Sequence, residues 1–365
     1  MKRNCREKIG IITIVDNNNY GNRLQNFAVA EVYRKLGFET DTLVLNQRKG
    51  SKKYILRAFR MLVTPFYQWL WLIFKDRQTL CRRRRFKGFN KENGLRFRYL
   101  PFWSNKLKRE YRFFSVGSDQ IWNSYQDLGY GTEFLTFAER EQRICFAPSF
   151  GVDSINPSKV QNFKTGLEGM PMLSVREESG AGLIRQLTGA NAEILLDPTF
   201  MLPREEWEKI IRKPSLDRME EPYLLEYFLA GEEEQLETEL AAFADTHGLF
   251  RMKMLDKRNL QLYCTDPAEF LYLIQHADLV ATDSFHAVVF SIIFDKPFLV
   301  FKRKNGEGMG DRIITLLKKL RLENKLGWKM DQDKIFEHEY SDSYEIIEKE
   351  KKKTICFLQR SVCGK

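Results

Sequence analysis

The stretch LVATDSFHAVVFSIIFDKPFLVF, residues 279–301, decides the fold. It contains a short apolar run, a polar turn, an apolar helical segment and a second apolar strand. In an open α/β sheet, ligands bind where strands end and helices begin. The polar turn is therefore predicted to carry chemistry, and Asp283, Ser284 and His286 are candidate site residues. His286 is one of only four histidines in the chain.

The start of the chain has the same order of elements. Residues 8–15, KIGIITIV, form a near-continuous apolar run, which is typical of a strand buried on both faces of a parallel sheet. A polar turn follows, then apolar residues at helical spacing over residues 24–36, a glycine stop and a second strand over residues 38–45. Because this rhythm returns after Pro222, we predict an α/β protein with two Rossmann-like domains facing a cleft.

The length and charge of the chain give a first view of its organisation. At 365 residues the chain is too long for one ordinary hydrophobic core, so we expect two domains, at 1–170 and 171–340. We also expect a C-terminal helix at 341–365 that packs back on the first domain. The 59 Lys and Arg against 49 Asp and Glu give a net charge of +10, which favours anionic partners.

Several classes of site are not indicated by the sequence. The six cysteines show neither a CxxC pair nor zinc-site spacing, and the first residues lack a secretory apolar region, so we expect a reduced, cytoplasmic protein without a bound metal. No P-loop, GxGxxG, GxSxG or HExxH motif is present. The aromatic residues lie in core-like runs without a recognition-helix motif, so no nucleic-acid partner is expected.

Residues 57–86 interrupt the α/β rhythm. They combine the apolar run LVTPFYQWLWLIF with arginines on both sides, and we expect a basic and aromatic helical insertion near 57–90. The apolar run is too short to cross a bilayer, which needs about 20 residues. One interpretation places Trp69 and Trp71 in a membrane interface with the arginines on acidic lipid. The other is a helical hairpin packed on its own domain.

Two further strand exits carry polar residues. Gly117, Ser118, Asp119 and Gln120 follow a predicted strand, where glycine permits close approach and the polar side chains fix hydroxyls. Arg176 follows another strand, where a guanidinium can hold a phosphate or carboxylate. Turn chemistry, a helix cap at Asp119 and pairing of Arg176 with a neighbouring glutamate are the structural alternatives.

Six segments resemble, in order, the signatures of the polysaccharide pyruvyl transferase family: NNNYGNRLQNFAV, VGSDQIWN, APSFGV, LSVREESG, LLDPTFML and TDSFHAVVFSIIFDKPF. The resemblance implies a GT-B-like fold. It also implies transfer of pyruvate from phosphoenolpyruvate, as a cyclic ketal with release of phosphate, onto a sugar of an envelope polysaccharide or its lipid-linked precursor. Phosphoenolpyruvate is then a substrate, and no cofactor is implied. One departure is Ala287, where the family usually has glycine after the motif histidine.

This chemistry needs a proton source, a base and an anion clamp. His286 titrates near neutral pH and suits proton exchange or phosphate binding, Arg176 suits the clamp, and Asp119 suits a sugar hydroxyl. These three are the predicted catalytic residues. The predicted substrate contacts are Tyr20, Asn22, Arg23, Gln25, Ser118, Gln120, Asp283 and Ser284.

Two other functions remain open at the level of sequence. A GT-B glycosyltransferase using a nucleotide sugar would share the fold, because fold does not fix function. A non-catalytic glycan-binding protein would bind sugar without consuming a donor. A lipid-linked oligosaccharide acceptor would place the protein in the cytoplasm, peripheral to the inner membrane face, with residues 57–86 on acidic lipid.

Overall fold

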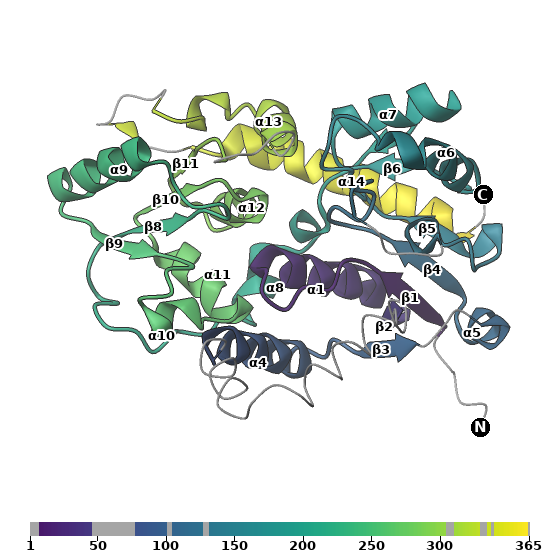
Figure 1. Ribbon diagram of the computed structural model, residues 1–365, viewed down its shortest axis with the longest axis horizontal. Coiled ribbons are helices and arrows are strands. Elements are labelled where there is room, and N and C mark those ends of the chain that lie inside the picture. The colour runs from purple at the N-terminus through teal and green to yellow at the C-terminus, as the bar shows by residue number, and fades with distance from the viewer. Residues whose placement is uncertain are drawn as a thin grey trace, which may run out of the picture.

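The computed structural model describes residues 7–45, 77–100, 104–126, 131–303, 310–328, 334–336 and 339–363. Two parallel sheets lie in two lobes with helices packed around them (Figure 1). The first lobe holds a five-stranded sheet in the order β3-β2-β1-β4-β5. Its strands are β1 (Lys8–Ile12), β2 (Glu39–Leu45), β3 (Phe97–Leu100), β4 (Phe113–Val116) and β5 (Arg143–Cys145).

The second lobe holds a four-stranded parallel sheet in the order β11-β10-β8-β9. Its strands are β8 (Tyr223–Tyr227), β9 (Phe250–Lys253), β10 (Leu279–Thr282) and β11 (Phe298–Val300). A parallel pair, β6 (Ser174–Val175) and β7 (Glu193–Ile194), forms a third small sheet. The predicted α/β class with two Rossmann-like sheets is confirmed, and all four residues of β10 are buried, as its apolar run indicates.

Helices connect the strands in the order expected for parallel sheets. The first lobe contains α1 (Tyr20–Lys35), α4 (Arg77–Glu92), α5 (Asn105–Glu110), α6 (Val160–Glu168) and α7 (Glu178–Thr188), and α8 (Arg204–Glu208) follows them. The second contains α9 (Glu234–Thr246), α10 (Leu260–Tyr263), α11 (Pro267–His276), α12 (Phe285–Ile293) and α13 (Gly310–Lys319). Helix α14 (Ser341–Cys363) comes last.

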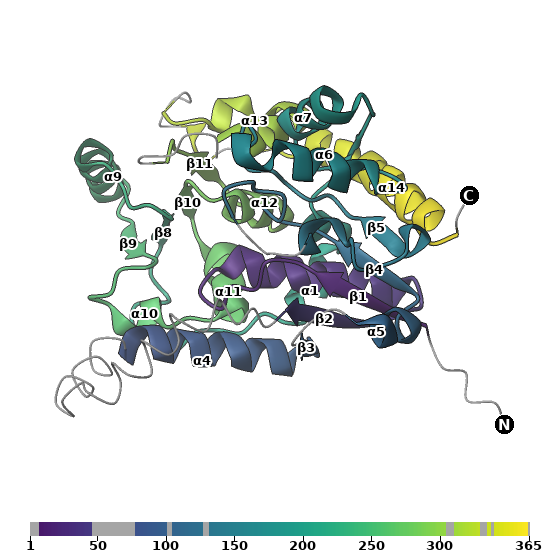
Figure 2. The same ribbon diagram turned by 45° about the vertical axis from the view of Figure 1, so that its right-hand side comes forward.

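Helix α1 lies where the two lobes meet. It packs on β1 and β2 of its own lobe and on α11 and α12 of the other, so it is buried on nearly all sides (Figure 2). The largest hydrophobic cluster accordingly includes Ile9 from the first sheet and Val280 from the second. Because this core is shared, it does not mark a boundary between domains, and the bounds 1–170, 171–340 and 341–365 stay a prediction.

The last helix contacts both lobes. Near its start, Tyr344 Oη donates to the carbonyl of Ile292 (2.9 Å). In its middle, Lys353 Nζ donates to the carbonyl of Ile194 (2.8 Å), and near its end Arg360 pairs with Glu193. Figure 1 shows α14, in yellow, running from the second lobe towards β5.

The insertion expected near 57–90 is described only in part, because residues 57–76 lie outside the described residues. Within α4, Arg82 is buried and donates to Tyr20 Oη (2.7 Å) and to the carbonyl of Tyr263 (2.6 Å). Arg85 pairs with Glu269 of α11. The assignment of these two arginines to lipid is therefore wrong, since their charges are used in contacts between the lobes. None of the described helices is long and apolar enough to cross a bilayer.

Candidate functional site

A polar pocket of about 360 Å³ lies where the two lobes meet. The turn between β1 and α1, the turn after β4, the first turn of α12, Arg303 after β11 and helix α13 all contribute to it. This is the expected place in a doubly wound sheet, because the carboxyl ends of its strands gather there. The lining residues are Ile14, Asp16, Asn19, Asn22, Asp119, Gln120, Gln126, Leu229, Ser284, Phe285, His286, Arg303 and Arg312.

His286 lies in the first turn of α12 and is 6% exposed. One edge of its imidazole packs on Gly21 of α1, where an added Cβ would lie 2.1 Å from Nδ1. Nε2 lies 3.8 Å from Asp197 Oδ2 and has no hydrogen-bond partner among the described residues. Burial lowers the pKa of His286, and the charges of Arg176 and Arg312 lower it further against the opposing effect of Asp197 and Asp119. The ring is thus neutral near pH 7.

Arg176 and Asp197 form a buried ion pair beside this histidine. The Arg176 side chain is 2% exposed, pairs with Asp197 and lies over the ring of Phe285, with 4.5 Å from its Cζ to the ring centroid. Burial alone would raise the pKa of Asp197, but Arg176, His286 and hydrogen bonds from Thr199 outweigh burial and lower it to about 2. The structure does not place Arg176 among the lining residues, because its charge is taken by Asp197.

Asp119 presents a carboxylate to the pocket. It has a left-handed backbone conformation (φ 64°), and its Oδ2 accepts a hydrogen bond from Asn22 Nδ2 (2.9 Å). Oδ1 lies 3.9 Å from Arg176 Nη2 and 3.8 Å from Arg312 Nη1. Burial would raise the pKa of Asp119, yet His286, which is protonated at the acid pH where Asp119 titrates, the charges of Arg176 and Arg312 and the bond from Asn22 lower it overall. The group is therefore ionised at neutral pH and can accept a hydrogen bond from a hydroxyl.

Two arginines supply the positive charge that reaches the pocket. Arg312 of α13 is buried, its Nε has no hydrogen-bond partner among the described residues, and burial lowers its pKa to about 10. Arg303 Nε donates to Asp283 Oδ2 (3.1 Å), while Asp283 Oδ1 accepts from the amide of Leu229 (2.8 Å). Asp283 thus orients Arg303 from behind the pocket wall instead of lining the pocket.

The sequence did not single out Asp197, Arg303 or Arg312 as site residues. Asp197 stands in an Asp-Pro pair that reads as a turn, although the segment LLDPTFML belongs to the resemblance. Arg312 follows a glycine-rich run, and that run, residues 304–309, lies outside the described residues. Only the tertiary fold brings α13 over the turn after β4.

The structure divides the predicted substrate contacts into two groups. Asn22, Gln120 and Ser284 line the pocket with Asp119 and His286. Four other predicted contacts lie behind or away from the pocket, so their prediction as lining residues is wrong. Tyr20 stacks on Phe270 and forms a hydrogen bond with Thr265, and Gln25 accepts a hydrogen bond from Thr13. Ser118 donates to the carbonyl of Ala147, and Arg23 donates to Asn22 and to the carbonyl of Ile14. Each of these four side chains is fully buried.

Residues 19–305 match the profile of the polysaccharide pyruvyl transferase family. The chain belongs to this family, which confirms the resemblance and supports a transferase enzyme of polysaccharide biosynthesis. No curated protein matches the chain significantly.

Three solved structures to which this chain is similar are two UDP-GlcNAc 2-epimerases and HepE. The UDP-GlcNAc 2-epimerase of Methanocaldococcus jannaschii, in complex with UDP-GlcNAc and UDP, is 11% identical, with 96% of this chain and 99% of that chain covered and a TM-score of 0.47. Anabaena HepE, in complex with UDP and glucose, is 9% identical (97% and 99% covered, TM-score 0.46). The UDP-GlcNAc 2-epimerase of Neisseria meningitidis bound to UDP-GlcNAc is 9% identical (97% and 100% covered, TM-score 0.44).

Proposed function

We propose that the protein transfers pyruvate from phosphoenolpyruvate onto a sugar as a cyclic ketal and releases phosphate. The observation that carries the proposal is an excess of unpaired hydrogen-bond donors around one pocket. Arg312 Nε and, behind it, Arg176 Nε and Nη2 have no hydrogen-bond partner among the described residues. Buried donors without acceptors are rare, so a ligand rich in anionic oxygens fits this site.

Phosphoenolpyruvate has this composition, because it carries a phosphate and a carboxylate on three carbons. Arg312 and Arg303 line the pocket, and positive charge that is already in place there would stabilise the departing phosphate. Arg176 takes a positioning role in the proposal: it holds Asp197, whose carboxylate faces His286 Nε2.

The reaction balances with two proton acceptors and no redox partner. The methylene carbon of the enol gains a proton, one sugar hydroxyl attacks the central carbon and loses its proton, and the bond from that carbon to the phosphate oxygen breaks. A second hydroxyl then attacks the same carbon and closes the ketal. The two hydroxyl protons are accounted for by the new methyl group and the released phosphate.

His286 and Asp119 are the groups placed to move these protons. A neutral imidazole accepts a proton from a hydroxyl and passes it on, and its Nε2 has room for such a contact. Asp119 is ionised and lies across the pocket on the turn after β4, where it orients the second hydroxyl. The two groups come from opposite lobes, so the acceptor is expected to lie between them.

A product assay tests the proposal directly. The protein is incubated with phosphoenolpyruvate and candidate oligosaccharides, with phosphate release followed by colour and the new ketal methyl group followed by NMR. Phosphate release that requires an acceptor, with a methyl signal on the sugar, is the expected result. Release of nucleotide from a nucleotide sugar, with phosphoenolpyruvate left intact, would instead indicate a glycosyltransferase. Binding of glycan with neither donor consumed would indicate a binding protein.

A lipid-linked acceptor and contact with an acidic membrane surface form the finer part of the proposal. The charge of +10 is compatible with such a surface. Arg83 and Arg84 of α4 are exposed, unlike the buried Arg82. Sedimentation with vesicles that contain acidic lipid, at low and high salt, tests this part separately.

A further inference from the structure

A second pocket, of about 480 Å³, opens between α4 and β3 on the first lobe. We propose that this α4–β3 pocket binds a sugar phosphate that forms part of the acceptor. The statement that this sugar phosphate belongs to the acceptor rests on the proposed function, but its binding can be tested without turnover. Its side chains that carry the argument are Asn17, Lys87, Asn90, Lys91, Phe97 and Tyr99.

The amide of Asn90 lacks one hydrogen bond. Its side chain lies in the pocket wall and is only 6% exposed. Nδ2 donates to Asn17 Oδ1 (3.3 Å), whereas Oδ1 has no hydrogen-bond partner among the described residues. A buried amide oxygen without a donor costs free energy, so a ligand that offers a hydroxyl is favoured here. Sugars present such hydroxyls.

Two aromatic side chains form one side of the pocket. Phe97 and Tyr99 are two residues apart on β3 and therefore lie on the same face of this edge strand. Tyr99 is 60% exposed, so its ring face is open to a ligand. An exposed ring face packs well against the apolar C–H face of a sugar while the sugar hydroxyls reach polar neighbours.

Two lysines give the pocket its charge. Lys87 and Lys91 lie four residues apart on α4, so their ammonium groups share one face of the helix and repel each other. Neither forms a salt bridge with another described residue. Arg96, at the same pocket, is by contrast paired with Asp41 and Glu39. A phosphate near the two lysines would relieve their repulsion, so the ligand is a sugar that carries phosphate.

The α4–β3 pocket and the transfer site share a wall. Asn17 lines the first, while Asp16 and Asn19 from the same turn line the second. Within this wall, the guanidinium of Arg23 lies 5.4 Å from the ring centroid of Phe97 and donates to the carbonyl of Ile14. A sugar phosphate held by α4 and β3 would therefore direct an attached sugar over this turn towards Asp119.

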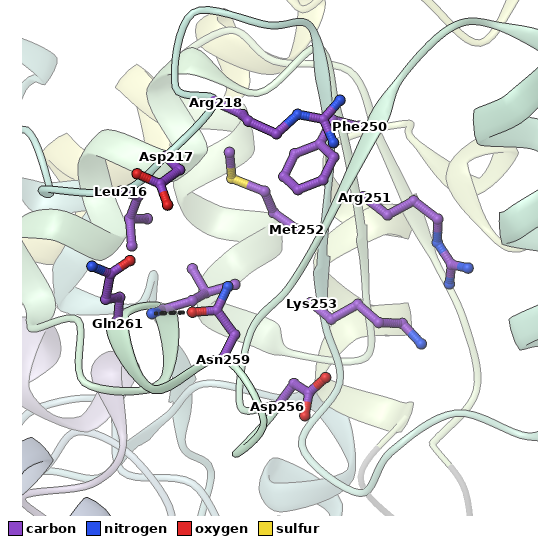
Figure 3. Close-up of a pocket in the computed structure, with 11 residues that line it drawn as sticks. Leu216, Asp217, Arg218, Phe250, Arg251, Met252, Lys253, Asp256, Asn259 and Gln261 are labelled. Atoms are coloured by element: carbon purple, nitrogen blue, oxygen red, sulfur yellow. Dashed lines mark hydrogen bonds between the residues drawn. The ribbon is translucent and has the colours of Figure 1, made fainter.

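A third pocket, of about 380 Å³ beside β9, differs from the α4–β3 pocket because its polar side chains are paired (Figure 3). Its cations Arg251 and Lys253 pair with Glu237, and its Asn259 Oδ1 accepts a hydrogen bond from the amide of Leu262 (3.0 Å). No buried side-chain atom of its lining lacks a partner among the described residues. It supplies a control surface of similar size.

The test is a direct binding measurement with glucose 1-phosphate, methyl glucoside and inorganic phosphate, by ligand-observed NMR on the full chain. The wild-type protein is expected to bind glucose 1-phosphate more tightly than methyl glucoside or inorganic phosphate. Tyr99→Ala should weaken its binding at least 10-fold, and Lys87→Gln with Lys91→Gln should remove the preference over methyl glucoside. Tyr125→Ala removes an equally exposed tyrosine (61%) and Gln261→Ala alters the β9 pocket, and both should bind as wild type.

The outcomes separate this inference from the proposed function. Unchanged glucose 1-phosphate binding in the α4–β3 variants would overturn it, and so would equal binding of inorganic phosphate. Thermal stabilisation by phosphoenolpyruvate is measured on the same variants and should persist, because its site is on the far side of the wall. If glucose 1-phosphate binds with the expected pattern but no phosphate is released from phosphoenolpyruvate with any acceptor, the pocket stands and the proposed transfer fails.

Discussion

The imidazole of His286 lies directly on the backbone of Gly21, with space for a hydrogen but not for a methyl group between them. A Cβ at Gly21 would lie 2.1 Å from Nδ1 and 2.4 Å from Cγ of the ring. Gly21 belongs to α1 of the first lobe and His286 to α12 of the second, so this contact fixes the histidine with respect to both lobes.

We predict that Gly21→Ala lowers kcat/KM for phosphoenolpyruvate by about 100-fold, because it displaces the ring from the transfer site. The matched control is Gly182→Ala in α7, where nothing lies within 4 Å of the added Cβ. That change should raise the free energy of unfolding by about 0.5–1 kcal/mol, with activity retained. Equal activity of the two variants would contradict the inference that the close contact with Gly21 positions the His286 ring.

His286→Ala should lower kcat by about 100-fold to 10,000-fold, as expected for loss of a general acid or base. His276→Ala is the control, since His276 is exposed and its Nδ1 contacts only the carbonyl of Tyr272. Because burial lowers the pKa of His286, its neutral form persists below the usual value of 6.5. The acidic limb of the pH profile should therefore have its midpoint below pH 6.5, and a midpoint above 7 would contradict the neutral assignment.

Asp197→Asn should destabilise the fold by about 3–5 kcal/mol, because it leaves Arg176 buried without its partner. Chemical denaturation measures this loss. The pKa of Asp197 is about 2 in the fold, against 3.8 ordinarily, so the stabilisation is complete above about pH 4 and is lost as the pH falls towards 2. The difference between wild type and variant should shrink over that interval. A difference that does not depend on pH would argue against an ionised Asp197.

If phosphoenolpyruvate is the donor, as proposed, Arg312→Gln should raise KM for it about 10-fold to 100-fold, because the proposed charged contact is lost. Lys318→Gln on the exposed side of the same helix loses one positive charge without reaching the pocket and should leave KM unchanged. Initial rates at varied donor concentration distinguish the two. A similar increase in both variants would indicate a general effect of net charge.

Arg82→Met should destabilise the protein by about 3 kcal/mol, since it removes the donor to Tyr20 Oη, to the buried carbonyl of Tyr263 and to the half-buried carbonyl of Asn18. Arg83→Met, at the exposed neighbouring position, should change the stability by less than about 0.5 kcal/mol. Thermal melting of the two variants and the wild type measures both changes in stability. If Arg83→Met is the more destabilising change, the assignment of Arg82 to the contact between the lobes fails.

The fold was predictable because its central strands, β1, β4, β8 and β10, are buried on both faces, and such strands appear in the sequence as apolar runs that end in polar turns. The same logic located Asp119 and His286, since each follows a strand. It could not locate Arg312, whose importance depends on where α13 lies. Tyr20 was misjudged because an aromatic residue in a polar turn resembles a sugar contact, whereas the second lobe covers it in the fold.

The chain's last helix ties the two lobes together, because Tyr344 near its start bonds to the carbonyl of Ile292 and Lys353 bonds to the carbonyl of Ile194, 159 residues earlier in the sequence. Together with the core shared around α1, this makes independent melting of either half unfavourable, because each would expose apolar surface from the other. Calorimetry should therefore record one cooperative transition, and a ligand that occupies either lobe should raise the melting temperature of the entire molecule.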